Sequence, residues 1–289
     1  MSGRSEYKKI LILVKTYPSP SKTYVETVCT AGIDESGNWI RIFPVPFRRY
    51  EGYKRYSKYQ WINCKVYKAE AVKDNRPESY HLDGEIDCLE KISGAQRLGK
   101  WEERRRIVLD NEEKRTYKSL DKLIEDGLGN KVTLAIFKPQ DIKLIVNRAH
   151  EKDSTRRKRV VAQVEARQGD LFDPKLYRDD FKLAEPIPYD FKYQVTDVNG
   201  KKANWKILDW ELGALFLNCK KSHHGDIEQA KADGIKMYRD RFLNKDKIDL
   251  YLYVGTLHQF QQRRVKNPWT IIGVAPFPKV NVRQMVFPL

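Results

Sequence analysis

Aromatic and basic side chains alternate along one short segment of this chain, in a pattern suited to binding chemistry. Between Phe47 and Trp61 the sequence reads FRRYEGYKRYSKYQW. Aromatic rings recur at every third position from Phe47 to Tyr59, and each ring face could stack on a base for about 1–3 kcal/mol without sequence preference. The cations between the rings could meet phosphates. The residues that we expect to bind nucleic acid here are Arg48, Arg49, Tyr50, Tyr53, Lys54, Arg55, Tyr56 and Tyr59.

The same segment also has a structural interpretation. Its tyrosines could pack on the protein's own core, while the arginine stems cover that core and their charged ends reach water. A spacing of three fits neither a strand nor a straight helix, so the tyrosines cannot all share one buried face. On that ground we favour the binding interpretation. We expect Tyr53 and Tyr56 to contribute to the binding of a single strand.

A second candidate surface lies on the strand predicted at residues 39–43. Trp39, Arg41 and Phe43 alternate there with two isoleucines, so they share one face of the strand. Together with Lys15 from a neighbouring predicted strand, Trp39 and Arg41 would form a binding platform on an open sheet. The alternative is that Trp39 and Phe43 pack beneath helices from the middle of the chain.

Carboxylates and histidines gather in the second half, where they could support catalysis. Asp209 and Glu211 stand close to His223, and His258 follows a predicted strand end. Asp209 is well placed to cap a helix, and the second ligand pair of a zinc site is missing. We therefore predict no metal site and no cofactor. If the chain is instead a metal-dependent nuclease or a nucleotide-processing enzyme, Asp209, Glu211, His223 and His258 are its candidate catalytic residues.

The charge of the chain favours a polyanionic partner. It carries 55 basic and 39 acidic residues, for a formal net charge of +16. Residues 1–73 hold 14 of the basic and 6 of the acidic residues, which is half of that net charge. Such a surplus suits DNA, RNA or an anionic surface. In the second half, the phosphate contacts that we expect are Arg156, Arg157, Arg159, Arg263 and Arg264.

The order of the predicted elements indicates an α+β protein with two domains. Strands predicted at 9–15, 23–33, 39–43, 61–72, 131–138 and 141–147, with a helical insertion over about 89–128, suggest a small OB-like barrel in residues 1–150. Residues 151–289 would form a second α+β domain. Its parts are a hairpin around Asn199-Gly200, helices capped by Asp209 and Asp226, and a final strand pair at 248–254 and 269–274.

The remaining sequence signals concern the compartment. No run approaches the ~20 apolar residues of a membrane-spanning helix, and the N-terminal residues lack a signal-peptide pattern. The four cysteines form no CxxC pair and no framework of secreted disulfides. We therefore expect a cytoplasmic protein that does not associate with membranes.

One part of the sequence resembles a known family. The strand Cys29-Thr30-Ala31-Gly32-Ile33 and the later Gly37-Asn38-Trp39-Ile40-Arg41 are similar to prokaryotic dual OB-domain proteins, which are often encoded near mobile-element and phage-defence genes. The resemblance implies nucleic-acid binding without catalysis, with Trp39 and Arg41 on the platform. The chain departs from that pattern in its long tyrosine-rich insertion, and its second half does not align.

Three hypotheses follow, and the sequence does not separate the first from the last. The leading one is non-catalytic binding of single-stranded or distorted DNA or RNA in a prokaryotic defence or nucleic-acid-processing system. The second is the enzyme described above. The third is a basic adaptor that holds a protein partner in a multi-component system through the same aromatic and cationic surface.

Overall fold

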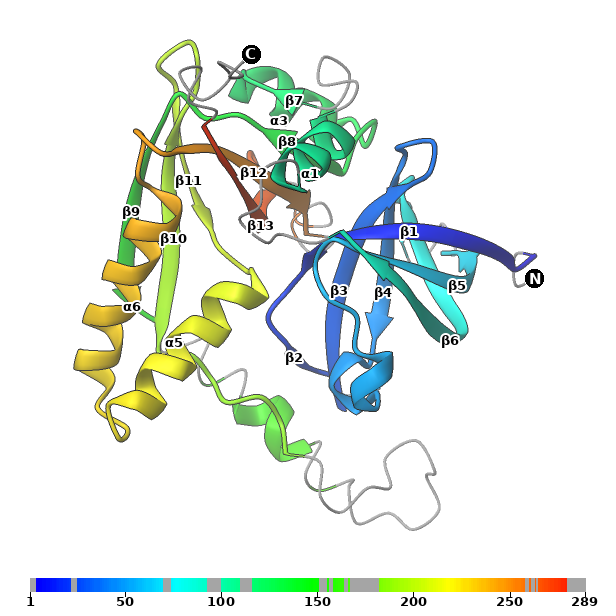
Figure 1. The fold of residues 1–289 in the computed structure, drawn as a ribbon, viewed down its shortest axis with the longest axis horizontal. Coiled ribbons are helices and arrows are strands. Elements are labelled where there is room, and N and C mark those ends of the chain that lie inside the picture. The colour runs from blue at the N-terminus through cyan, green and yellow to red at the C-terminus, as the bar shows by residue number, and fades with distance from the viewer. Residues whose placement is uncertain are drawn as a thin grey trace, which may run out of the picture.

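Two parts make up the chain in the computed structural model, a closed β-barrel at the N-terminus and a larger α+β part after it (Figure 1). The structure describes residues 4–21, 25–69, 74–92, 100–109, 116–150, 155, 158–163, 166, 182–257, 260, 263 and 265–279. None of the helices described in these ranges is long and apolar enough to cross a membrane.

Five strands close the barrel. β1 (Glu6–Lys15) pairs antiparallel with both β3 (Val25–Asp34) and β5 (Gln60–Lys68). β6 (Ser79–Lys91) pairs antiparallel with β5 and parallel with β4 (Trp39–Val45), which in turn pairs with β3, so every barrel strand has two neighbours. A short strand, β2 (Ser19–Ser21), adds to the edge of β3. Two 3₁₀ turns, η1 (Phe47–Arg49) and η2 (Gly52–Lys54), connect β4 to β5.

The first strand is buried on both of its faces, which explains its uninterrupted apolar run. Ile10 and Ile12 point into the barrel core, where they join Ile40 and similar side chains of the other strands. Leu11 and Leu13 point outward and belong to a different core, which the barrel shares with the second part of the chain. Successive strand residues point to opposite faces, so a strand packed on both sides has no polar positions in its middle.

The second part is built around two sheets. The central sheet has the order β13-β12-β8-β7, and a smaller sheet has the order β11-β10-β9. Helices α5 and α6 follow the smaller sheet in the chain. The bounds are α1 (Lys100–Leu109), β7 (Thr116–Tyr117), α3 (Leu120–Leu128), β8 (Leu134–Phe137), β9 (Asp141–Arg148), β10 (Tyr189–Thr196), β11 (Lys202–Lys206), α5 (Trp210–Ser222), α6 (Ile227–Phe242), β12 (Ile248–Thr256) and β13 (Trp269–Pro278).

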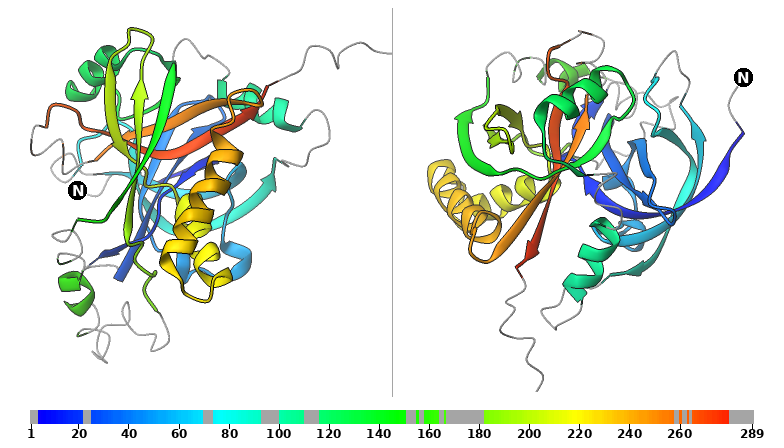
Figure 2. Two further views of the ribbon diagram at one scale, coloured as in Figure 1. Left: turned by 90° about the vertical axis from the view of Figure 1, so that its left-hand side faces the viewer. Right: turned by 90° about the horizontal axis from the view of Figure 1, so that it is seen from above.

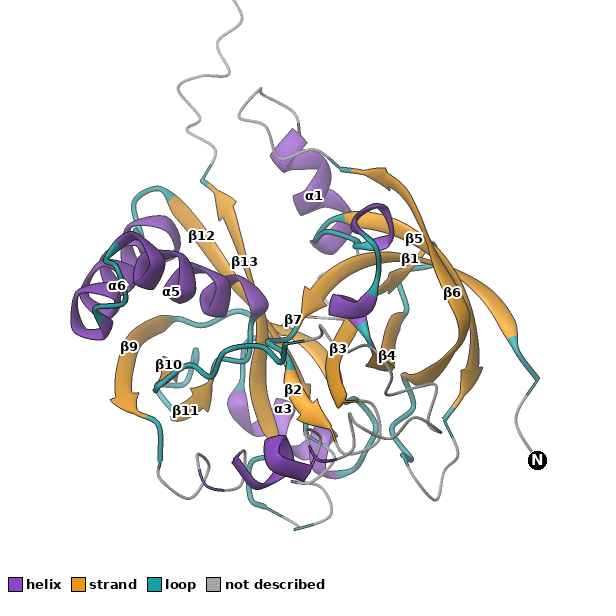
Figure 3. Ribbon diagram, turned by 90° about the horizontal axis from the view of Figure 1, so that it is seen from below, coloured by secondary structure: helices purple, strands orange, loops and turns teal. Residues whose placement is uncertain are grey.

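The central sheet separates two cores. Along β12, Leu252 and Val254 face the core of the second part, which contains side chains of α5 and α6. Tyr251 and Tyr253 alternate with them and face the outer surface of the barrel. Figures 2 and 3 show β12 and β13 between the helix pair and the barrel. The barrel and the second part therefore meet across a continuous apolar interface, which we call the seam.

Local signals in the second half are confirmed. Gly200 adopts a positive φ of 78° in the turn that joins β10 and β11, the hairpin predicted there. Asp209 caps α5 by accepting a hydrogen bond from the Glu211 amide, and Asp226 caps α6 in the same way. The final strand pair, β12 and β13, is antiparallel as expected.

Two expectations about the first half need correction. Residues around Leu89 belong to strand β6, and helix α1 begins only at Lys100, after the last barrel strand. The predicted strands at 131–138 and 141–147 exist, but they pair with β12 and β10 of the second part. β6 closes the barrel in their place. Its many polar residues hid it in the sequence, because a barrel strand can face water on its outer side.

Candidate functional site

Most rings of the segment between β4 and β5 are buried in the protein's own core. Phe47, Tyr56 and Tyr59 are 5%, 1% and 4% exposed, and Tyr50 is half-buried. Tyr53 is the exception, with 70% of its surface exposed. Tertiary packing buries these rings: Phe47 and Tyr56 belong to the barrel core and Tyr59 to the seam, and only Phe47 and Tyr53 lie in the 3₁₀ turns. A base could stack on Tyr53, whereas Tyr56 and Tyr59 are not available for that role.

The cations of this segment have different surroundings. Arg48 forms an ion pair with the buried Glu26, and Lys54 pairs with Glu85. Arg55 is exposed and donates to the backbone carbonyls of Arg48 and Tyr50, which fixes the turn without neutralising its charge. Arg49 is half-buried.

The predicted platform is covered. Arg41 is only 2% exposed, and its guanidinium donates to the hydroxyl and the carbonyl of Thr133, both at 2.9 Å. Trp39 packs edge-on against Tyr253 of β12, with 6.1 Å between ring centroids. Phe43 stays 41% exposed. The face that we expected to be an open sheet is therefore the barrel's side of the seam, where the central sheet covers it and Trp101 and Val108 of α1 join the same core.

Lys15 lies in a box of aromatic rings at the edge of the seam. Its Nζ is 3.9 Å from the Phe47 ring centroid, 4.7 Å from Trp210 and 5.8 Å from Tyr56. Phe47 and Tyr56 come from the barrel, and Trp210 is the first residue of α5. The backbone next to Lys15 brings them together, because the Tyr17 amide donates to the Leu208 carbonyl at 2.7 Å.

Two carboxylates and a second lysine complete the site. Lys58 donates to the carbonyl of Val274 at 2.6 Å and to Glu211 Oε2 at 3.2 Å. Asp209 is 5% exposed, and its Oδ2 accepts a hydrogen bond from the Val274 amide at 3.1 Å. We call Lys15, Lys58, Asp209 and Glu211 the seam cluster. Both lysines come from the barrel and both carboxylates from the second part.

Burial shifts the proton affinities of the seam cluster. It lowers the pKa of Lys15 from 10.5 to about 8, although Glu211 and Asp209 act in the opposite direction. It raises the pKa of Asp209, and Lys58 offsets only part of that rise. Lys58 holds the pKa of Glu211 below its usual range. Burial alone would lower the pKa of Lys58, but the two carboxylates hold it above its ordinary value. Strongly shifted groups of this kind are typical of functional sites, although buried ion pairs shift them too.

The two lysines of the cluster differ in what they can do. Lys58 has a carbonyl and a carboxylate as acceptors, so it can serve as a structural link across the seam. Within the part of the chain that the structure describes, Lys15 makes one long approach, 3.5 Å, to the Tyr56 carbonyl and otherwise faces ring surfaces. Cation–π contacts of this kind contribute about 0.5–2 kcal/mol each and occupy no hydrogen-bond acceptor. Lys15 is therefore the group in this site with spare capacity to bind or react.

The other predicted catalytic residues do not join the seam cluster. His223 ends α5, at the opposite end of the helix from Glu211, and its Nε2 lies 2.7 Å from Asp233 Oδ2. His258 lies outside the described residues, as do Arg156, Arg157 and Arg264. Arg159 and Arg263 are exposed. Within the described ranges, no three His, Cys, Asp or Glu side chains are grouped to hold a metal ion.

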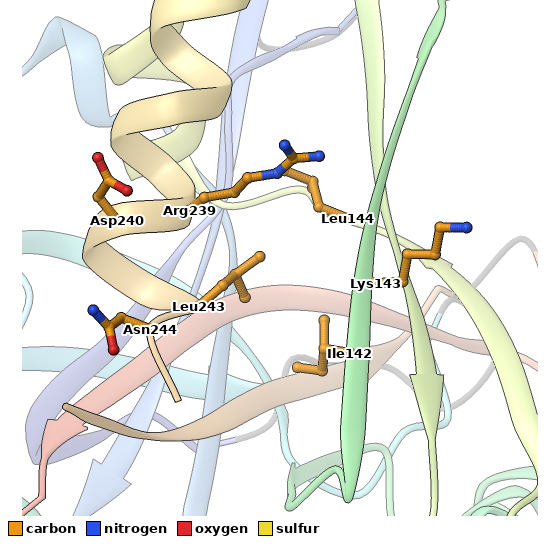
Figure 4. Close-up of a pocket in the computed structure, with 7 residues that line it drawn as sticks. All are labelled: Ile142, Lys143, Leu144, Arg239, Asp240, Leu243 and Asn244. Carbon is orange, nitrogen blue, oxygen red and sulfur yellow. The ribbon is translucent and has the colours of Figure 1, made fainter. Parts of the chain in front are cut away.

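A groove of about 440 Å³ lies elsewhere in the second part, between β9 and the C-terminal end of α6 (Figure 4). Its apolar lining comes from Ile142, Leu144 and Leu243, and Arg239 extends across it toward Leu144. No residue that the sequence singled out lines this groove.

Comparison with known families divides the chain in the same place as the structure does. A family model described as "Domain of unknown function (DUF8757)" matches residues 113–287, which is more than half of the chain. The chain belongs to the DUF8757 family. A second model, "Domain of unknown function (DUF8758)", matches residues 6–110. No curated protein matches the chain.

The DUF8757 match begins about 40 residues before the boundary that we expected near residue 150. The strand pairings agree with this earlier division, because β8 and β9 join sheets of the DUF8757 part. Each part supplies half of the seam cluster.

The sequence pattern placed Lys15, the tyrosine-rich segment and Asp209-Glu211 in three separate groups, and it assigned no role to Trp210. The sequence holds only a weak signal that could have linked them, which is the position of Trp210 directly after the helix cap Asp209.

Proposed function

We propose that this chain binds single-stranded or distorted nucleic acid through the barrel, on a surface formed by the turns between β4 and β5. The observation that carries the proposal is the exposure of Tyr53. Its ring is 70% exposed, with Lys54 Nζ 5.5 Å from its centroid and the exposed Arg55 two residues away. A ring with a free face beside cations is the unit that binds a base and its phosphate.

The strand arrangement of the barrel supports the proposal. The third and fifth barrel strands, β4 and β6, pair in parallel and close the barrel, as they do in an OB-fold. OB-folds commonly bind oligonucleotides on their second and third strands. Those strands, β3 and β4, carry Ala31, Ile33 and Arg41 toward the seam here. The binding surface is therefore displaced from the usual face to the turns at the edge of the barrel.

The net charge of +16 supports the same activity, since many of the basic residues lie on exposed positions. Phosphate binding by lysine and arginine releases counterions, so the affinity must fall as salt is added. Four phosphate contacts on a single strand predict a loss of roughly 50-fold between about 50 and 200 mM salt.

Fluorescence anisotropy with labelled single-stranded DNA, single-stranded RNA and duplex tests the proposal at those two salt concentrations. We expect tighter binding to single strands than to duplex, with the stated loss of affinity in salt. An affinity that does not respond to salt, or no binding at low salt, would refute it. Parallel gels with and without magnesium would reveal cleavage, which the proposed function excludes.

A further inference from the structure

Two lysines enter the seam from the barrel, and only one of them has a structural explanation. Lys58 is 14% exposed in its side chain and bonds to both a carbonyl and a carboxylate of the second part. Lys15 is attracted by the same carboxylates but bonds to neither, and its one hydrogen bond to a described residue is the long approach to Tyr56. Instead its ammonium lies 4.7 Å from the ring centroid of Trp210, the residue directly before Glu211. An ammonium that only stabilised the fold would be expected to take the nearby carboxylate, as Lys58 does.

The surroundings of Lys15 favour its neutral form. Three rings replace most of the water around the amine, and Arg55 and Lys91 act against its charge from nearby. With a pKa of about 8, roughly one Lys15 side chain in ten is a free amine at pH 7. An ordinary lysine reaches roughly one in three thousand. A desolvated lysine of this kind is the usual nucleophile of Schiff-base chemistry.

The box around Lys15 is only partly buried. Lys15 is half-buried rather than enclosed, and so are Trp210 and Tyr17, whose ring centroids lie 6.2 Å apart at the edge of the box. Tyr56 and Phe47, which form the floor of the box, belong to the segment that carries Tyr53 and Arg55. A strand bound at Tyr53 would therefore pass close to this segment.

We propose that Lys15 is a Schiff-base lysine that captures the aldehyde of an abasic nucleotide. The proposal rests on the nucleic-acid binding proposed above. An abasic sugar in its ring-opened form presents a free aldehyde, and its extrusion from a strand requires the least unstacking because the base is already missing. The aromatic box matches a small sugar without a base better than it matches a whole nucleotide, since Lys15 already occupies its centre.

The chemical step balances without a metal or an oxidant. The Lys15 nitrogen attacks the C1′ carbonyl carbon, a C–N bond forms, and the carbonyl electron pair moves to oxygen, which takes up a proton. Loss of that oxygen as water then gives the imine. The amine gives up its two protons to water, and Glu211, whose carboxylate is 44% exposed, acts on Lys15 electrostatically.

Reductive trapping tests the proposal with the full chain. A labelled single strand with one abasic site, made by uracil excision, is incubated with the protein and sodium cyanoborohydride, which converts an imine into a stable amine. We expect a covalent adduct that mass spectrometry maps to Lys15. Lys15→Met should reduce the adduct at least tenfold. Lys9→Met is the matched control, because Lys9 is also on β1 and pairs with Glu35 and Glu90 on the surface; it should trap as the wild type does.

Additional experiments distinguish a failure of nucleic-acid binding from a failure of the Schiff-base role. Anisotropy with an intact strand, without reductant, measures binding alone: binding with no adduct overturns the Schiff-base role and leaves the proposed function standing, whereas no binding overturns both. Propionaldehyde in place of the strand tests the source of the aldehyde. Labelling of Lys15 by propionaldehyde with no adduct to the abasic strand would overturn the abasic assignment. An adduct that maps to other lysines, or that persists in a folded Lys15→Met variant, would overturn the role of Lys15.

Discussion

Arg41 on β4 and Thr133 just before β8 are joined by two hydrogen bonds, from Nη1 to the hydroxyl and from Nη2 to the carbonyl, each 2.9 Å long. The two residues are 92 positions apart and lie in different parts of the protein. The Thr133 hydroxyl donates in turn to Glu78, so a charged arginine is held in the seam by a polar network. The sheet face around Arg41, which we expected to bind a ligand, is therefore an interface inside the protein.

The first prediction concerns that network. We expect Arg41→Met to reduce the free energy of unfolding by about 1.5–3 kcal/mol or more, because each hydrogen bond from a charged donor contributes roughly that much and the Thr133 carbonyl would keep only its bond from the Thr256 amide. Urea denaturation measures the change. Arg106→Met, at an exposed position of α1, is the control and should stay within about 0.5 kcal/mol of the wild type. A neutral Arg41→Met variant would contradict the structural role.

The second prediction separates binding from folding. Tyr53→Ala should weaken binding of a single strand by about 1–3 kcal/mol, since one stacked base is lost, and should leave the melting temperature unchanged. Tyr7→Ala is a close control, because Tyr7 is also a barrel tyrosine with 70% exposure but lies on β1, away from the turns. Anisotropy on both variants checks this. Equal effects of the two substitutions would show that Tyr53 has no special role.

The third prediction concerns the loss of folding stability caused by the buried charge of Lys15. Its pKa is lower in the folded chain than in the unfolded chain, so the unfolded chain binds the proton more tightly. The wild type therefore gains stability as pH rises from about 8 to 10.5 and is destabilised by the buried charge below that window. We expect Lys15→Met to be more stable at pH 7 by about 1–2 kcal/mol, less than the full value of roughly 3 because Lys15 is partly exposed.

Thermal melting across pH checks the sign. The advantage of Lys15→Met over the wild type should shrink steadily between pH 8 and 10.5 and vanish above it. A constant difference between the two proteins at every pH would mean that the charge of Lys15 is not the cause.

The fourth prediction concerns the link between Lys58 and Glu211. Loss of one partner costs about 0–1 kcal/mol of stability in an exposed ion pair and about 3–5 kcal/mol in a buried one. Lys58 is nearly buried while Glu211 is 44% exposed, so we expect this pair to lie between those limits. We expect Lys58→Met to cost about 2 kcal/mol. The double variant with Glu211→Gln should lose less than the sum of the two single losses, by about 0.5–3 kcal/mol. Strict additivity in urea denaturation would show that the pair does not couple across the seam.

The fifth prediction follows from Asp209. Its pKa rises from 3.8 to about 6 on folding because the carboxylate is buried. The folded chain then binds the proton more tightly than the unfolded chain, so stability falls as pH rises from about 4 to 6 through this group. Asp209→Asn keeps a helix cap but removes the titration. The stability of the wild type relative to Asp209→Asn should therefore decrease across that window and stay level above it, which chemical denaturation at several pH values measures.

Local order was predictable from the sequence. The caps Asp209 and Asp226 and the Asn199-Gly200 turn depend on groups within a few residues of one another, so their chemistry is written into short stretches of the chain. The basic surplus and its concentration in the first quarter are also properties of sequence alone. The caps, the turn and the apolar patterns beside them identified most of the strands and helices of the second half.

The tertiary structure alone decided which strands close the barrel and what covers its outer face. An apolar pattern shows that a face is buried but does not identify the element that covers it. Leu11 and Ile33 therefore did not predict that the central sheet packs on the barrel. The pattern of tyrosines was likewise ambiguous, because side chains far away in the sequence bury Tyr56 in the barrel core and Tyr59 in the seam. Lys15, Trp210 and Glu211 form one site only because a strand end of the barrel pairs with the chain before α5. Such long-range contacts depend on the packing of whole elements, which no short segment encodes.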